Sequence, residues 1–163
     1  MMRVSMLNKT FLLLLSAMLL FACGDSKKKA EPKKNIGRVL EYTDSLTFLD
    51  AEGASVSTIR FIKADDPNER NQGLMNVNSM PQDAGMVFYF DTEEPQSFWM
   101  ANTPLPLDIM YVNADSVIVS IYKSTVPFSE NSLPSGAPAK YVIETNAGYS
   151  ISNDIKEGMK VRF

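Results

Sequence analysis

Short apolar runs separated by turn residues fill most of the chain after residue 35. The runs are rich in β-branched and aromatic side chains, which are typical of strands. They predict strands at residues 36–42, 46–49, 55–62, 85–90, 97–100, 107–112, 117–122 and 140–145, and a last short one after Gly158. Many short strands at this spacing predict a mainly β domain, either a sandwich or a barrel-like fold.

One segment breaks the strand pattern. Asp66 is placed as an N-cap, Pro67 occupies the first turn, and Glu69 completes a capping box. Gly73 stands where a helix of about two turns ends. We therefore predict a single short helix near residues 66–73 in an otherwise β domain.

Two further stretches differ in composition from the rest of the chain. Residues 98–108 hold the only tryptophan, two prolines and a polar Asn-Thr pair, and they lead into an apolar strand. Residues 127–138 contain three prolines, a glycine and three serines, which predicts a long surface loop. We expect a binding surface where these two stretches lie.

The N-terminus has the features of a targeting segment. Arg3 and Lys9 precede an apolar run at residues 11–21, which is too short to span a membrane. The run ends at Ala22-Cys23-Gly24, which resembles the lipobox of bacterial lipoproteins. Residues 1–22 are therefore predicted to be a lipoprotein signal peptide and Cys23 the lipidated residue. An ordinary signal peptide or a single anchoring helix is the alternative.

Charge divides the rest of the chain. Residues 24–35 carry five lysines and two acidic residues, and they lack large apolar side chains, so residues 23–35 are predicted to be a lipid anchor and disordered tether. Residues 36–163 carry nine basic and seventeen acidic residues, a net charge of −8, and form the single predicted domain. An acidic domain argues against nucleic acid as a partner. The expected location is the bacterial cell envelope, with the domain facing the periplasm or the exterior.

The missing residue types limit the chemistry. The sequence has no histidine and one cysteine, which excludes Ser-His-Asp and Cys-His sites. It has no phosphate-binding or dinucleotide fingerprint, so no cofactor is expected. The domain's methionines suit a Cu(I) site or a packed core, and without histidine or free thiol we expect core positions and no metal.

Five residues are candidates for ligand binding: Trp99, Asn102, Thr103, Asp108 and Glu144. Trp99 belongs either to an aromatic groove or to the core, and strand alternation places it on the face opposite to Phe98 and Met100. Asn102, Thr103 and Asp108 either hold a polar ligand or cap the turn between them. Asp108 and Glu144 form the best carboxylate pair for a hydrolytic mechanism, provided that they lie within about 10 Å of each other.

Ordered sequence blocks resemble one known family. Gln72-Gly73-Leu74-Met75, the segment at residues 98–103 and Lys140 to Glu144 match motifs of the family called domain of unknown function 192, and the similarity covers residues 56–161. The resemblance implies a compact, mostly β protein, secreted or membrane-attached, with no established reaction. The family commonly has Arg where Gln72 stands and Lys where Ala101 stands, so a basic pair for an anion site is missing.

These observations predict a lipid-anchored binding or accessory module of the cell envelope, without catalytic residues. Its partner is expected to be a small polar ligand or an envelope protein, and its membrane contact the N-terminal lipid. An envelope hydrolase that uses Asp108 and Glu144, or a structural assembly factor, are the alternatives.

Overall fold

The computed structural model describes residue 38 and residues 40–163, which lie within one compact unit, Asn35–Phe163. The signal peptide, Cys23 and the tether lie outside the described residues. The elements are β1 (Asp44–Leu49), β2 (Ser55–Ala64), α1 (Pro67–Gln72), β3 (Ala84–Phe98), β4 (Leu107–Val112), β5 (Ile118–Tyr122), β6 (Leu133–Asn146), α2 (Tyr149–Ser152) and β7 (Lys160–Arg162). The protein is mainly β, as predicted.

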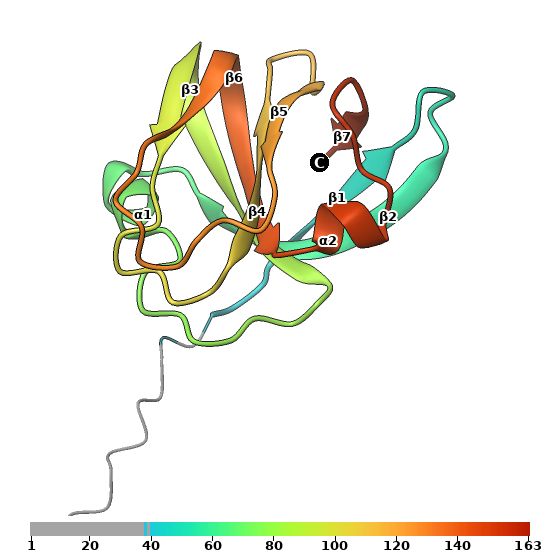
Figure 1. The fold of residues 1–163 in the computed structure, drawn as a ribbon. Coiled ribbons are helices and arrows are strands. Elements are labelled where there is room, and N and C mark those ends of the chain that lie inside the picture. Colours follow the sequence, from blue (N-terminus) through green and yellow to red (C-terminus); the bar gives the residue numbers. More distant parts are fainter. Residues whose placement is uncertain (1–37, 39) are drawn as a thin grey trace, which may run out of the picture. The chain divides into compact units, whose positions relative to one another are not determined.

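The seven strands form one strongly curled sheet in the order β5-β4-β6-β3-β2-β1-β7 (Figure 1). A β-bridge between Val117 and Lys160 brings the two edges of the sheet together. The amide of Ile118 also donates to the Met159 carbonyl, at 2.9 Å. Of the two predicted architectures, the structure therefore has the barrel-like one.

Only β2 and β3 pair in parallel, in register from Arg60–Ala84 to Ala64–Phe88. Parallel neighbours need a crossover connection, and here it consists of α1 and the segment that follows it. The crossover covers one face of the sheet, which places α1 beside β3 (Figure 1). This crossover between β2 and β3 therefore forms one wall of the site described below.

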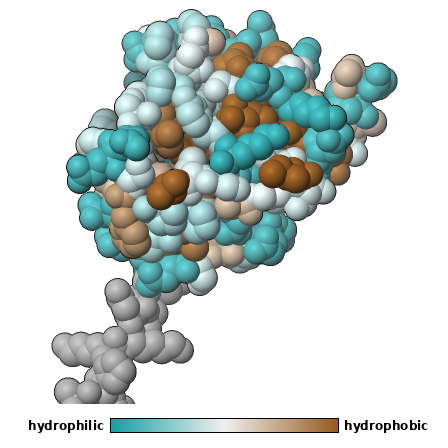
Figure 2. All heavy atoms as spheres, viewed as in Figure 1, coloured by the Kyte–Doolittle hydropathy of each residue, from teal (hydrophilic) through white to brown (hydrophobic). Residues whose placement is uncertain are grey.

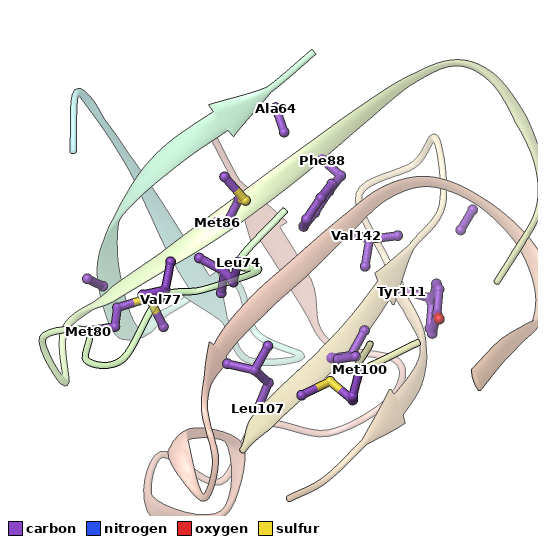
Figure 3. Packing of buried hydrophobic residues seen from close by; sticks show 13 residues of the cluster. Ala64, Leu74, Val77, Met80, Met86, Phe88, Met100, Leu107, Tyr111 and Val142 are labelled. Carbon is purple, nitrogen blue, oxygen red and sulfur yellow. The ribbon is translucent and has the colours of Figure 1, made fainter. Parts of the chain in front are cut away.

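Alternation along the central strands buries both faces of the sheet. Val87 and Ile143 point into the cluster inside the curl, whereas Met86 and Val142 belong to the cluster on the outer face. Figure 3 shows this outer cluster, in which Leu74 from the crossover and Met100 pack with the strand residues. The methionines are divided between the clusters: Met80, Met86 and Met100 lie in the outer one and Met110 in the inner one. They fill core positions.

Several predicted boundaries were wrong. The described residues of the segment at 36–42 are not strand. The predicted strands at 85–90 and 97–100 belong to one long strand, β3, which ends at Phe98. A second helix, α2, was not predicted; it has only four residues and no side-chain cap.

The predicted loop at residues 127–138 is also too long, because β6 begins at Leu133. Pro134 pairs with Ser97 and Pro138 with Pro95, in a part of β6 that has only β3 as a neighbour. Proline is tolerated where a strand has one free side, since its missing N–H breaks no ladder there. Pro134 and Pro138 therefore lie in the outer half of a strand, whereas Pro127 lies in the loop before it.

Candidate functional site

A cavity of about 330 Å³ lies between α1, the outer half of β3 and the turn at residue 103. Its walls come from three separate parts of the chain: Pro67 to Met75, Phe88 to Trp99 with Thr103, and Glu144. This volume lies at the small end of the range for ligand sites. The cavity can therefore hold a small organic molecule.

Helix α1 is fixed at both ends, as the sequence predicted. Asp66 accepts from the amides of Asn68 and Glu69 at 2.7 and 2.9 Å, and the Glu69 carboxylate accepts from the Asp66 amide. Gly73 ends the helix with φ +45°, and a Cβ there would lie 3.4 Å from the ring of Phe88. A short, well-capped helix thus holds the polar side chains of one wall against the aromatic wall opposite.

Among the described residues, Glu144 is the one acidic residue that lines the cavity. It lies on β6 between Met86 of β3 and Ile109 of β4, and only 5% of its surface is exposed. Its carboxyl group forms no hydrogen bond or ion pair with any described residue. Burial raises its pKa from an ordinary value of 4.5 to about 8. At neutral pH the Glu144 carboxyl group is therefore mostly protonated.

Gln96 provides a second polar group without a partner in the same cavity. Its side-chain nitrogen is buried and forms no hydrogen bond, although its backbone amide donates to Ser135 Oγ at 3.0 Å. Buried polar groups are nearly always paired in folded proteins, so each exception needs an explanation. The described residues hold three such buried unpaired atoms, on Ser57, Gln96 and Thr145, and of these residues only Gln96 lines the cavity.

Aromatic rings form much of the remaining surface. Phe98 packs edge-on against Phe88, with ring centroids 4.9 Å apart, and also contacts Phe90 and Tyr111. Trp99 follows on the opposite side of the chain and is 58% exposed at the cavity. The predicted alternation is confirmed: Phe98 and Met100 pack in the outer cluster and Trp99 does not.

The two residues of the Asn-Thr pair have different surroundings. Thr103 is buried and lines the cavity, and its amide donates to the Met100 carbonyl at 3.0 Å. Asn102 is exposed with φ +57°, and its carbonyl accepts from the Asn76 amide at 2.9 Å. Asparagine tolerates this left-handed conformation better than most residues, so Asn102 has a turn role.

Asp108 does not belong to the cavity. Its carboxylate is fully buried and accepts hydrogen bonds from four donors: the amides of Ser124, Gly148 and Ser150 and the Ser150 hydroxyl, at 2.7–3.1 Å. These bonds connect β4 to the segment that follows β5 and to the start of α2. Asp108 therefore has a structural role, but it does not cap the turn at residues 102–108 as the sequence suggested, because its donors are 16 to 42 positions away along the chain.

Of the five candidates, the cavity brings together Trp99, Thr103 and Glu144. The carboxylate pair of the hydrolase hypothesis is not assembled, because Asp108 is paired with Thr145 and Glu144 with Ile109, on opposite faces of the sheet. Sequence reasoning missed Gln96 and Arg70. The predicted helix includes Arg70, so its place on this wall could have been expected. The polar stretch around Gln96 gives no sequence signal that this residue is buried.

Arg70 supplies the only positive charge on the cavity wall. Its guanidinium donates to the carbonyls of Asp65 and Tyr89 and lies 5.5 Å from the ring centroid of Phe90. It is thus already engaged at the end of the cavity near Phe90. Within the described residues there is no cluster of three or more metal-ligating side chains, and no helix is both long and apolar enough to cross a membrane.

Comparisons with known proteins agree with this fold. The family model DUF192, described as Uncharacterized ACR, matches residues 48–163. A crystal structure of a protein from Sinorhizobium meliloti 1021, called a candidate transcription regulator, is 33% identical, with a TM-score of 0.71 over 77% of this chain and 97% of that one. A protein of unknown function from Novosphingobium aromaticivorans is 27% identical, with a TM-score of 0.70 over 82% and 99% of the two chains. No curated protein matches the chain.

Proposed function

Because the chain belongs to the DUF192 family, which offers no reaction to carry over, we propose a function from the site itself: a small-molecule binding module of the cell envelope. The observation that carries the proposal is the buried, unpartnered carboxyl of Glu144 on the wall of a ligand-sized cavity. Keeping such a group costs stability, and proteins commonly accept that cost at functional sites.

The composition of the cavity favours binding without catalysis. Glu144 lines the cavity together with aromatic side chains such as Phe88 and Phe98 and a few further polar groups. This is the usual composition of small-molecule sites. The other buried carboxylate, Asp108, is occupied by its four hydrogen bonds and is not available as a second acid or base.

The second part of the proposal concerns location. The apolar run that ends at Ala22-Cys23 supports lipidation of Cys23, and more than one acyl chain on that residue would give stable anchoring. The tether predicted from the sequence at residues 24–35 would span roughly 20 Å as a random coil. We propose that the domain samples ligands close to the membrane surface. The net charge of −8 on residues 36–163 gives no support for nucleic acid as the ligand.

The binding function is tested by thermal melting of the full chain with a panel of fragment-sized amines, alcohols and carboxylic acids. A ligand that binds only the folded state raises the melting temperature. We expect at least one class to stabilise the wild type, and expect Trp99→Ala and Thr103→Val to weaken that effect. The exposed Val56→Ala substitution, away from the cavity, is the matched control. Absence of stabilisation by all three classes would refute the binding function.

A further inference from the structure

We infer that the cavity takes a small organic ammonium ion, with Glu144 as its counter-ion and the phenyl rings around its apolar body. This inference rests on the proposed function and assigns the chemical class of its ligand. Three observations support it: the Glu144 carboxyl group without a partner, the aromatic walls of the cavity, and the unpaired donor of Gln96.

The first observation is the distribution of charge along the cavity. Glu144 is paired with Met86 of β3, whereas Arg70 is bonded to the carbonyl of Tyr89, three residues further along the strand. At about 3.3 Å per residue, the two backbone positions on β3 that these residues contact are roughly 10 Å apart. The cation of Arg70 already has two carbonyl acceptors and an aromatic ring, whereas the carboxyl of Glu144 has nothing. Glu144 is therefore the acidic group on this wall without a partner, and a positive charge beside it would stabilise its ionised form.

The second observation is the aromatic wall. Four aromatic residues line the cavity: Phe88, Phe90, Phe98 and Trp99. Aromatic faces attract ammonium groups through the ring quadrupole, most strongly where water is excluded. A ring face repels an anion, so wherever one of these rings turns its face to the ligand it favours a cation. The rings therefore favour the same sign of ligand charge as Glu144 does.

The third observation sets a further requirement on the ligand. The side-chain nitrogen of Gln96 is a buried donor without an acceptor on the same cavity. The nitrogen has almost no accessible surface, so a hydroxyl or carbonyl oxygen on the ligand would satisfy it once the side chain turns towards the cavity. The preferred ligand thus combines an ammonium group, an apolar body and a hydrogen-bond acceptor.

Binding of a cation is linked to release of a proton from Glu144. Two other charged or titratable groups are near this carboxyl: Arg70 on α1, and Tyr111 on β4, whose hydroxyl donates to the Leu133 carbonyl. Burial keeps the pKa of Tyr111 above its usual range, so its phenol stays neutral, and Arg70 stays charged. Glu144 is then the only one of the three that changes charge between pH 6 and 8.

The test compares three probes of one shape: phenethylammonium, its neutral analogue phenethyl alcohol, and the anion phenylacetate. Calorimetry on the full chain measures affinity and proton release, and Trp99, the only tryptophan, reports by fluorescence on occupancy of the cavity. We expect phenethylammonium to bind tightest, to release close to one proton per ligand at pH 7, and to bind about tenfold more weakly at pH 6 than at pH 7.

Variants separate the site from general charge effects. Glu144→Gln keeps the shape but removes the charge, and we expect it to abolish the proton release and the pH dependence. Glu52→Gln, at an exposed turn, should leave both unchanged. Equal binding of phenethyl alcohol, or tighter binding of phenylacetate, would overturn the ammonium inference and leave the binding function standing. No response from any probe in either assay would overturn the ammonium inference, and the binding function as well if the wider panel also fails.

Discussion

Asp108 and Glu144 occupy diagonal positions on the neighbouring strands β4 and β6, yet their carboxyl groups lie on opposite faces of the sheet. Side chains alternate along a strand, so two residues that are one register position apart point to opposite faces of the sheet and into different environments. Asp108 receives four hydrogen bonds, whereas Glu144 receives none from the described residues. The same chemical group thus stabilises the fold at one position and remains available at the other.

Substitution of Asp108 should therefore destabilise the protein. Asp108→Ala leaves up to four buried donors without an acceptor, and we expect a loss of about 3 kcal/mol in the free energy of unfolding. Denaturant melts read as a change of midpoint at constant slope measure this loss. Glu144→Gln, the paired comparison, should leave stability at pH 7 unchanged or raise it. The reverse order of the two variants would contradict the assignment of roles.

The Glu144 carboxyl also predicts how stability depends on pH. Its pKa is raised to about 8 in the folded state, from 4.5, so between these values the folded protein holds a proton that the unfolded chain has lost. The stabilisation that this proton gives the folded state is fully present below pH 4.5. It is lost as the pH rises to 8, and the free energy of unfolding falls by up to about 1.4 kcal/mol per pH unit.

Glu144→Gln removes this dependence. The stability of the variant relative to the wild type should increase as pH rises from 5 to 8, measured by urea melts at each pH. Parallel stability curves of the two proteins over this range would show that Glu144 titrates normally.

Gly85 next to this site should not tolerate a side chain. A Cβ at this position would lie 2.5 Å from the backbone oxygen of Glu144, so β3 and β6 would have to separate. We expect Gly85→Ala to cost about 1–3 kcal/mol, as overpacking does. Gly136→Ala has open space around it but a φ of +70°, so it reports the cost of backbone strain alone. A Gly85→Ala protein as stable as the wild type would argue against this close approach.

The sequence predicted the parts of the fold that depend on local signals. The capping box of α1 and the strands β4 and β5 follow from cap residues and from apolar runs. It did not predict that Leu133 to Pro138 extends β6, because prolines normally indicate a loop and the free side of that strand is visible only in three dimensions.

The site was predictable only in part, for a related reason. Trp99, Thr103 and Glu144 were candidates by residue type, but the cavity depends on the crossover that carries α1 across the sheet. Which carboxylate is satisfied depends on register and on long-range partners such as Ser150, 42 positions away from Asp108. Neither relationship is a property of local sequence.

The anchoring proposal has its own test at Cys23, outside the described residues. Cys23→Ala should abolish incorporation of a clickable fatty acid and release the protein from the membrane fraction or leave it unprocessed. A second substitution, Ser26→Ala in the tether, controls for effects of mutation near the processing site. Label retained on the Cys23→Ala protein would exclude this cysteine as the acceptor.

The central claim is that Glu144 lines the cavity with an unpaired carboxyl group, and titration of this group tests the claim most directly. Carbon-13 NMR of the glutamate carboxyl groups, with the Glu144 signal assigned by its absence from Glu144→Gln, gives the pKa in the full chain. We predict a pKa of about 8 in the free protein, and a decrease towards the ordinary range when phenethylammonium is added. A pKa near the ordinary glutamate value of about 4.3 in the free protein would contradict the account.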